Sequence, residues 1–231
     1  MRAVLFSLIG FGGLLILLLA GWVTARLTGA LQYYTTPSPA NVPTLRVGDN
    51  FFTSNLVQPK RLDFIAYQHR DQAGQSSVWM HRLCGLPGDT LEMRRGLLYV
   101  NGQNLDAALH LQHYYTLAKA DFAHLPAAAA ADTLGADRTS SPDSIARIGL
   151  NDSEVARYHL PARRMVLPAT YFDSYIQQQH QRRWNQDNFG PLVVPANSYF
   201  VLGDSRHNAM DSRYIGVIPK EDFWGTILGK H

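Results

Sequence analysis

Residues 76–105 read SSVWMHRLCGLPGDTLEMRRGLLYVNGQNL, and this stretch decides the fold class. Short runs of valine, leucine and aromatic residues alternate with turn residues, a pattern that predicts strands. Asn101-Gly102 stands between two such runs and favours a tight hairpin. Similar runs occur at 49–57 and 61–69. We therefore expect a mostly β protein built on antiparallel sheets.

The middle of the chain has a different character. Residues 107–183 contain an alanine-rich stretch, a glutamine-rich stretch, mixed helical periodicity and several loop signals. We interpret them as an inserted α/β subdomain. The β core is then expected from residues 32–106 and 184–231, with strand patterns returning after the insertion.

The N-terminus predicts a membrane anchor. Residues 3–25 carry no charge and are dense in leucine. One helix of that length spans the roughly 30 Å hydrocarbon core of a bilayer. A cleaved signal peptide is the competing interpretation, because small residues suited to cleavage occur at 23–25 and 28–30, but the apolar run is long for that role. We expect a retained transmembrane anchor over residues 1–28.

The charges beside this segment set its expected orientation. The amino terminus and Arg2 lie on one side and Arg26 alone lies close on the other, which places the N-terminus in the cytoplasm. We thus expect a single-pass protein of the bacterial inner (cytoplasmic) membrane, with residues 32–231 on the extracytoplasmic side.

Composition excludes several function classes. The 231 residues are 46% hydrophobic and 17% charged, so the chain should fold rather than stay disordered. The 21 basic and 18 acidic residues are scattered, which argues against nucleic-acid binding. Cys84 is the single cysteine, so there is no internal disulfide and no multi-cysteine zinc site. We expect Cys84 to be a small core residue.

Four blocks of sequence, taken in their order along the chain, form a specific pattern. They are PSPANVPTL and VGD within 37–49, PKRLD at 59–63, WMHRLCGLPGD at 79–89 with LYVNG at 98–102, and GDSRHNAMDSR at 203–213. Together they resemble the bacterial type I signal peptidases (leader peptidases, S26 family). These are membrane-anchored serine endopeptidases that remove signal peptides from exported proteins. The resemblance implies the same β fold after the anchor, no cofactor and no metal, and signal peptides or preproteins as partners.

The residues that carry the family's chemistry differ here. A serine nucleophile and a neutral lysine base are required by that route. The nucleophile position matches Ala40 and the lysine position matches His81. A further family serine, which orients the lysine, matches Ala209. Retained is Ser38, whose hydroxyl, with the backbone N–H of Ala40, corresponds to the family's donors to the developing oxyanion.

The framework around these positions is kept. Asp211 and Arg213 are placed to pair across their loop, and the glycines and proline of 85–89 suit a tight turn. The matching structural residues are Arg82, Gly85, Pro87, Gly88, Asp89, Gly203, Asp204, Arg206, Asp211, Ser212 and Arg213.

Our interpretation is a catalytically degenerate family member that retains a peptide-binding groove, in which Ala40, His81 and Ala209 cluster beside Ser38. Whether the chain is an enzyme stays open at this point. One alternative is an active peptidase that uses a Ser38/His81 pair, although residues two apart in an extended segment lie roughly 6–7 Å apart. Another is a structural or assembly module in the membrane with no groove.

A metal site made of His81 and His207 with Asp204 or Asp211 is a further alternative, although no tight ligand spacing supports it. Besides signal peptides and the lipid bilayer, the partners considered are a working signal peptidase and the secretion machinery.

Overall fold

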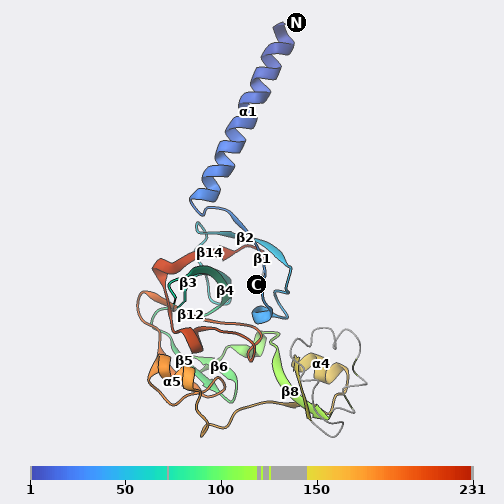
Figure 1. Cartoon of the computed structure of the whole chain (residues 1–231), viewed down its shortest axis with the longest axis vertical. Helices are drawn as coiled ribbons and strands as arrows, with labels where there is room; N and C mark the ends of the chain where they lie inside the picture. Colours follow the sequence, from blue (N-terminus) through green and yellow to red (C-terminus); the bar gives the residue numbers. More distant parts are fainter. Residues whose placement is uncertain (1, 72, 119–120, 122–124, 126–144, 230–231) are drawn as a thin grey trace.

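The structure is a computed structural model that describes residues 2–71, 73–118, 121, 125 and 145–229. Helix α1 (Arg2–Leu27) projects away from a β body that contains the other described elements (Figure 1). No helix in these ranges combines the length and the apolarity needed to cross a membrane. Met1 lies outside the described residues, and the anchor over 1–28 stays a prediction.

The largest sheet is antiparallel, with seven described strands. It combines strands from the early and the late parts of the sequence. The strand formed last in sequence lies between two early strands. In spatial order the strands are β1 (Gln32–Thr35), β2 (Asn50–Ser54), β14 (Phe223–Ile227), β3 (Phe64–Arg70), β4 (Ser76–Gly85), β12 (Ser198–Leu202) and β13 (Ile218–Pro219).

Both faces of this sheet are covered at β3, which explains why the stretch Phe64–Tyr67 is buried without alternation. Phe64 and Ala66 pack into one apolar cluster with Leu45, whereas Ile65 and Tyr67 pack into another on the opposite face. Alternate residues of a strand point to opposite faces, so each face receives half of the run. The sheet is thus a rigid support for side chains placed at its edge.

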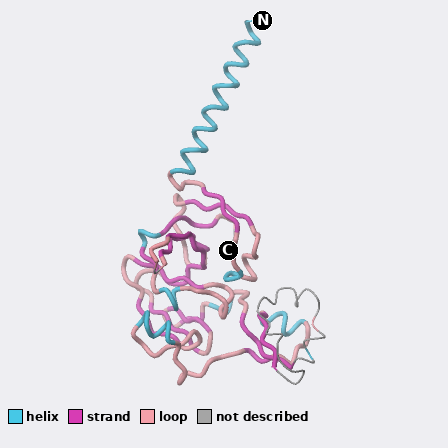
Figure 2. Tube along the Cα trace, viewed as in Figure 1, coloured by secondary structure: helices cyan, strands magenta, loops and turns pink. Residues whose placement is uncertain are grey.

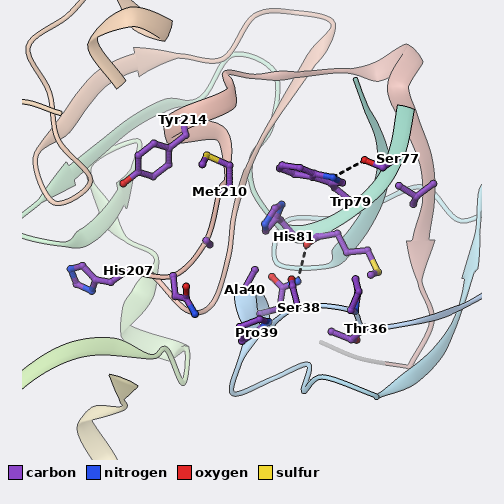
Figure 3. Close-up of a pocket in the computed structure, with 16 residues that line it drawn as sticks. Thr36, Ser38, Pro39, Ala40, Ser77, Trp79, His81, His207, Met210 and Tyr214 are labelled. Carbon is purple, nitrogen blue, oxygen red and sulfur yellow. Dashed lines mark hydrogen bonds between the residues drawn. The ribbon is translucent and has the colours of Figure 1, made fainter. Parts of the chain in front are cut away.

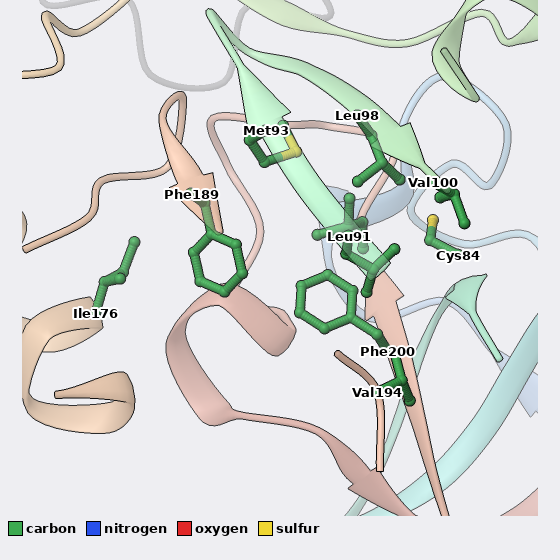
Figure 4. Close-up of a cluster of buried hydrophobic side chains, with 10 residues drawn as sticks. Cys84, Leu91, Met93, Leu98, Val100, Ile176, Phe189, Val194 and Phe200 are labelled. Atoms are coloured by element: carbon green, nitrogen blue, oxygen red, sulfur yellow. The ribbon is translucent and has the colours of Figure 1, made fainter. Parts of the chain in front are cut away.

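A second antiparallel sheet packs below the first. Its strands, in order, are β11 (Phe189–Val193), β5 (Thr90–Arg94), β6 (Leu97–Val100) and β7 (Gln103–Asn104). Asn101 and Gly102 have φ values of 50° and 82° and connect β6 to β7, which confirms the predicted hairpin. Figure 4 shows the core where this sheet meets β4 and β12, and Cys84 lies fully buried within it, as expected.

The expected insertion contains a small sheet and a core of its own. Its described elements are β8 (His113–Ala118), β9 (Ile145–Leu150), β10 (Arg163–Arg164) and α4 (Asp152–Arg157). Tyr115 and Ile148 belong to a separate apolar cluster between these elements. Residues 119–120, 122–124 and 126–144 of the expected insertion lie outside the described residues and are grey in Figure 2.

One helix assigned to the insertion from sequence belongs by packing to the main core. Helix α5 (Ser174–His180) buries Ile176 completely in the cluster that also holds Cys84. The remaining helices are short: η1 (Pro39–Asn41), η2 (Asp106–Ala108), α6 (Ser212–Ile215) and η3 (Lys220–Asp222). The prediction of a mostly β antiparallel fold is confirmed.

Candidate functional site

A cavity of about 740 Å³ opens at the edge of the seven-stranded sheet (Figure 3). Three segments distant in sequence line it, within 36–41, 77–81 and 207–214. Ser38, Ala40, His81 and Ala209 all lie on its wall. The structure therefore brings together the four residues that the sequence singled out.

Ala40 is fixed by backbone contacts. It lies in η1, which Ser38 precedes as the N-terminal cap residue. The Ala40 carbonyl accepts a hydrogen bond of 3.0 Å from the backbone N–H of Ser205. A side chain on Gly203 would collide with that carbonyl and with the Ala209 methyl. Gly203 thus allows the segments that carry Ala40 and Ala209 to touch.

Asn41 ties the same segment to strand β4. Its side chain is buried, and its amide nitrogen Nδ2 donates a 2.7 Å hydrogen bond to the carbonyl of Met80. Met80 immediately precedes His81, so this bond sets the distance between η1 and the histidine. The Asn41 Oδ1 atom is buried and has no hydrogen-bond partner among the described residues.

His81 is almost fully buried, with 3% of its surface exposed, and its Nδ1 atom lies 2.7 Å from the hydroxyl of Tyr67. Burial lowers the pKa of His81 to about 4, an effect that nearby Asp211 only partly opposes. Burial also raises the pKa of Tyr67 well above its usual value. At neutral pH the pair is therefore an uncharged imidazole and a protonated phenol.

The tautomer of His81 follows from this contact. The Tyr67 hydroxyl has no other hydrogen-bond partner among the described residues, and a buried hydroxyl proton is costly to leave unbonded. The hydroxyl therefore donates to Nδ1, so the imidazole proton resides on Nε2. Among the described side chains none bonds Nε2, and the ring faces the cavity (Figure 3). His81 thus presents a hydrogen-bond donor to the cavity rather than a lone pair.

Buried ion pairs hold the loop of residues 203–213. Arg82 makes two hydrogen bonds to Asp204, of 2.7 and 2.6 Å, and Arg213 makes two to Asp211, of 2.8 and 2.7 Å. The pairing expected between Asp211 and Arg213 is confirmed. Asp211 also accepts a hydrogen bond from the backbone of Gly203, at 3.1 Å. These contacts fix the loop and leave its carboxylates occupied.

Two other framework side chains bond at the same loop. Ser212 accepts a 2.9 Å hydrogen bond from the N–H of Val201 in β12, and Arg206 forms two 2.6 Å hydrogen bonds to Asp106 in η2. The loop is therefore joined both to the large sheet and to the start of the expected insertion.

The turn before β5 is built around Asp89. Its carboxylate accepts hydrogen bonds from the backbone of Leu86 at 2.6 Å, from Arg61 at 2.7 Å and from the side chain of Asn101 at 2.8 Å. Gly88, with φ +86°, follows Pro87 in this turn. Gly85 packs with no room for a side chain. These residues shape the β4–β5 connection and lie outside the cavity wall.

His207 is oriented by a different set of contacts. Its Nδ1 atom accepts a 3.1 Å hydrogen bond from the backbone of Tyr114, and its Nε2 atom lies 3.1 Å from Asp187. In the described ranges no group of three or more histidine, cysteine or acidic residues is arranged to hold a metal ion. The alternative that joined His81 and His207 in a metal site has no support in this geometry.

Sequence reasoning overlooked Tyr67, the partner of His81. The contact follows from the register of the β3–β4 hairpin, in which Ile65 faces His81 and Tyr67 faces Trp79, and that register is known only from the structure. Residues diagonal across an antiparallel pair share a face and come within reach of an aromatic side chain. The sequence likewise does not identify Asp187 as the partner of His207, because the two residues are 20 apart in the chain.

The site and the fold define a class: an antiparallel β protein in which three of the four resembling sequence blocks meet around a cavity at a sheet edge. The chain matches the family described as signal peptidase, peptidase S26, over residues 10–228, and it belongs to that family. It is 25% identical over 219 residues to a signal peptidase I of Buchnera aphidicola subsp. Baizongia pistaciae, covering 84% of this chain and 67% of the relative.

Other relatives agree. A signal peptidase I of Aquifex aeolicus is 28% identical over 211 residues, covering 84% of this chain and 73% of that protein. Among solved structures, a signal peptidase I from Enterococcus faecalis V583 is 23% identical and has a TM-score of 0.35, covering 74% of this chain and 97% of that one.

Proposed function

We propose that this protein binds the C-terminal region of signal peptides, on preproteins or after release, and holds it without cutting it. It acts as a single-pass protein of the bacterial cytoplasmic membrane, anchored by residues 1–28, with the β body on the extracytoplasmic side. Membership of the signal peptidase family supports this class of partner.

The observation that carries the proposal is the chemistry of the cavity wall. Ala40, His81 and Ala209 line one cavity, and they stand where the family's serine nucleophile, lysine base and orienting serine are expected. Methyl groups at two of these positions can neither attack a carbonyl nor orient a base. A family site with this wall retains space for a peptide but lacks the groups for peptide hydrolysis.

The same wall suits a peptide carbonyl. The Nε2–H of His81 faces the cavity, and the Ser38 hydroxyl makes no hydrogen bond to a described residue. An extended peptide that lies beside β4 would place a carbonyl near these donors, while the cavity accepts its side chains. Because burial keeps His81 neutral, this binding needs no charge on the peptide.

The alternative of an active Ser38/His81 pair meets two obstacles. A general base must accept a proton through a lone pair that faces the nucleophile, but the Tyr67 hydroxyl occupies the accepting nitrogen of His81. A pKa of about 4 also makes His81 a weak base at neutral pH. Cleavage by this pair would require the ring to exchange its tautomer and so reverse the direction of its hydrogen bond with Tyr67.

The deciding experiment is processing of a fluorescent preprotein by the detergent-solubilised full-length chain. The variants are Ser38→Ala, His81→Ala and the triple variant Ala40→Ser/His81→Lys/Ala209→Ser, each also tested for binding by anisotropy. We expect binding without cleavage by the wild type and cleavage by the triple variant. Wild-type cleavage that is lost in Ser38→Ala would establish the alternative peptidase. Absence of binding by every form would favour a structural module.

A further inference from the structure

A second cavity lies beside the first and shares part of its wall. It measures about 200 Å³, and Pro39 and Asn208 line both cavities. Its far side is formed by residues of the insertion, Gln112, Tyr114 and Gly149, and its rim includes Arg46. The two cavities therefore adjoin at Pro39 and Asn208, so that one bound chain is able to contact both.

The insertion is held firmly at this place. Gln112 receives a backbone hydrogen bond of 2.9 Å from Arg206 and donates one of 2.9 Å to the carbonyl of Asp204. The Oε1 atom of Gln112 accepts a 2.9 Å hydrogen bond from the hydroxyl of Ser205. The wall of the second cavity is thus built into the same loop that carries Ala209, so both cavities keep one geometry.

Several side chains on this wall can donate hydrogen bonds. The guanidinium of Arg46 is exposed and forms no ion pair with a described residue. With Oε1 of Gln112 engaged, its Nε2 amide has no partner among the described residues and faces the cavity. The side-chain amide of Asn208 is likewise unbonded within the described part of the chain.

Acidic groups are absent from the eight described residues that line the second cavity. Asp49 approaches the backbone N–H of Arg46, at 3.0 Å, and is not part of the wall. A second cation, Arg147, lies over the ring of Tyr114 at 5.8 Å. A cluster of donors with a cation and no carboxylate is complementary to an anionic acceptor.

We propose that the second cavity is a subsite for an acidic side chain, aspartate or glutamate, of the same peptide that occupies the first cavity. The inference rests on the proposed function, because the first cavity must hold the peptide before the second can bind a residue further along the same peptide. It gives the insertion a role, namely selection of peptides with a carboxylate at a fixed spacing from the bound small residues.

The test is a binding series in anisotropy with the full-length chain in detergent. The parent is a short fluorescent peptide with small residues for the first cavity. Longer peptides extend the parent at either end. Each carries glutamate at one added position, and a matched peptide carries glutamine at the same position. We expect one position at which glutamate binds about fivefold more tightly than glutamine, the upper range for a half-exposed ion pair, with the gain reduced by added salt.

The variants assign the effect to Arg46. Arg46→Gln should abolish the glutamate preference and leave binding of the short parent unchanged. Arg46→Glu should shift the preference to a peptide with lysine at that position. Arg157→Gln in α4 is the matched control, because it removes an exposed arginine of the insertion outside the cavity wall, and it should keep the preference.

The outcomes separate the two proposals. If the short parent binds but no position prefers glutamate, or the preference survives in Arg46→Gln, the acidic subsite is refuted while the proposed function stands. If the parent itself does not bind, the proposed function and the subsite both fail.

Discussion

His81 makes the folded protein sensitive to acid. Its pKa is about 4 in the folded chain, against about 6.5 when unfolded, so between these values the unfolded chain binds the extra proton. Stability is therefore complete above pH 6.5 and decreases as the pH falls towards 4, by about 3 kcal/mol for this residue. Urea unfolding at pH 7 and pH 4.5 measures the loss.

His81→Gln is the matched control for that prediction. Glutamine can accept from Tyr67 and still donate to the cavity, but it does not titrate. We expect a smaller loss of stability at low pH than in the wild type, with peptide binding at pH 7 retained. His113, whose pKa burial lowers to about 2, contributes to the remaining dependence in both forms. Equal pH slopes in the two proteins would contradict the assignment.

The reactivity of individual cysteine side chains tests the burial of Cys84 and the exposure of position 40. Cys84 is fully buried, and burial raises the pKa of its thiol to about 12, so the wild type should resist maleimide under native conditions. Ala40→Cys adds a thiol on the cavity wall and should be labelled at one equivalent, with peptide slowing the reaction. Labelling of the native wild type at a similar rate would show that Cys84 is accessible.

At the scale of elements, a buried ion pair ties η2, which follows the second sheet, to the loop of residues 203–213. Asp106 in η2 makes two 2.6 Å hydrogen bonds to Arg206, and both side chains are 2% exposed. Asp106→Asn would leave the guanidinium charge buried without a carboxylate. We expect a loss of about 3–5 kcal/mol in the free energy of unfolding, measured by denaturant titration.

The exposed pair Arg94–Glu92 is the matched control for that loss, because it has the same 2.6 Å contact at the surface. Glu92→Gln is the same acid-to-amide change, and we expect less than about 1 kcal/mol from it. Similar losses in the two variants would contradict the role given to burial.

Local chemistry explains which elements were predictable. The Asn101-Gly102 hairpin and the Asp211–Arg213 pair involve residues close in sequence, and both predictions were confirmed. The Tyr67–His81 bond depends on strand register, and the bond from Asn41 to Met80 joins residues 39 apart. Turn and strand propensities carry no information about such contacts, which arise only when the sheet is assembled.

The packing of helix α5 with the main core was not predicted from the sequence, for a related reason. Helix α5 is polar apart from a few residues, and its glutamine-rich sequence resembles the neighbouring insertion. A single residue, Ile176, binds it to the main core, with complete burial. Composition averages over a segment, whereas packing depends on individual side chains.

At the scale of the whole molecule, apolar surface gathers where α1 meets the β body. Tyr33 and Phe52 are about half exposed, their rings lie 5.2 Å apart, and they share a surface pocket with Trp22 of α1. Trp224 of neighbouring β14 is also 36% exposed. Figure 1 shows β1, β2 and β14 at the end of the body nearest α1. With the proposed anchor in place, this surface faces the headgroups.

Fluorescence in vesicles tests this orientation. Full-length protein in bilayers with brominated acyl chains should lose tryptophan emission, and Trp224→Phe should remove part of the quenched signal. Trp184→Phe is the control, because Trp184 packs against the core cluster at α5, at the other end of the body. Equal quenching in both variants would place the β1–β2–β14 end away from the lipid.

The order of the three cavity segments has a consequence for biosynthesis. Thr44 and Asp204, whose side chains are hydrogen-bonded at 2.5 Å, are 160 residues apart, and the cavity wall is complete only when segment 207–214 joins segments 36–41 and 77–81. A ribosome makes the N-terminal segments first. The cavity of a nascent copy therefore stays incomplete until residues 207–214 have emerged, so under the proposed function the chain gains its peptide site only after that point.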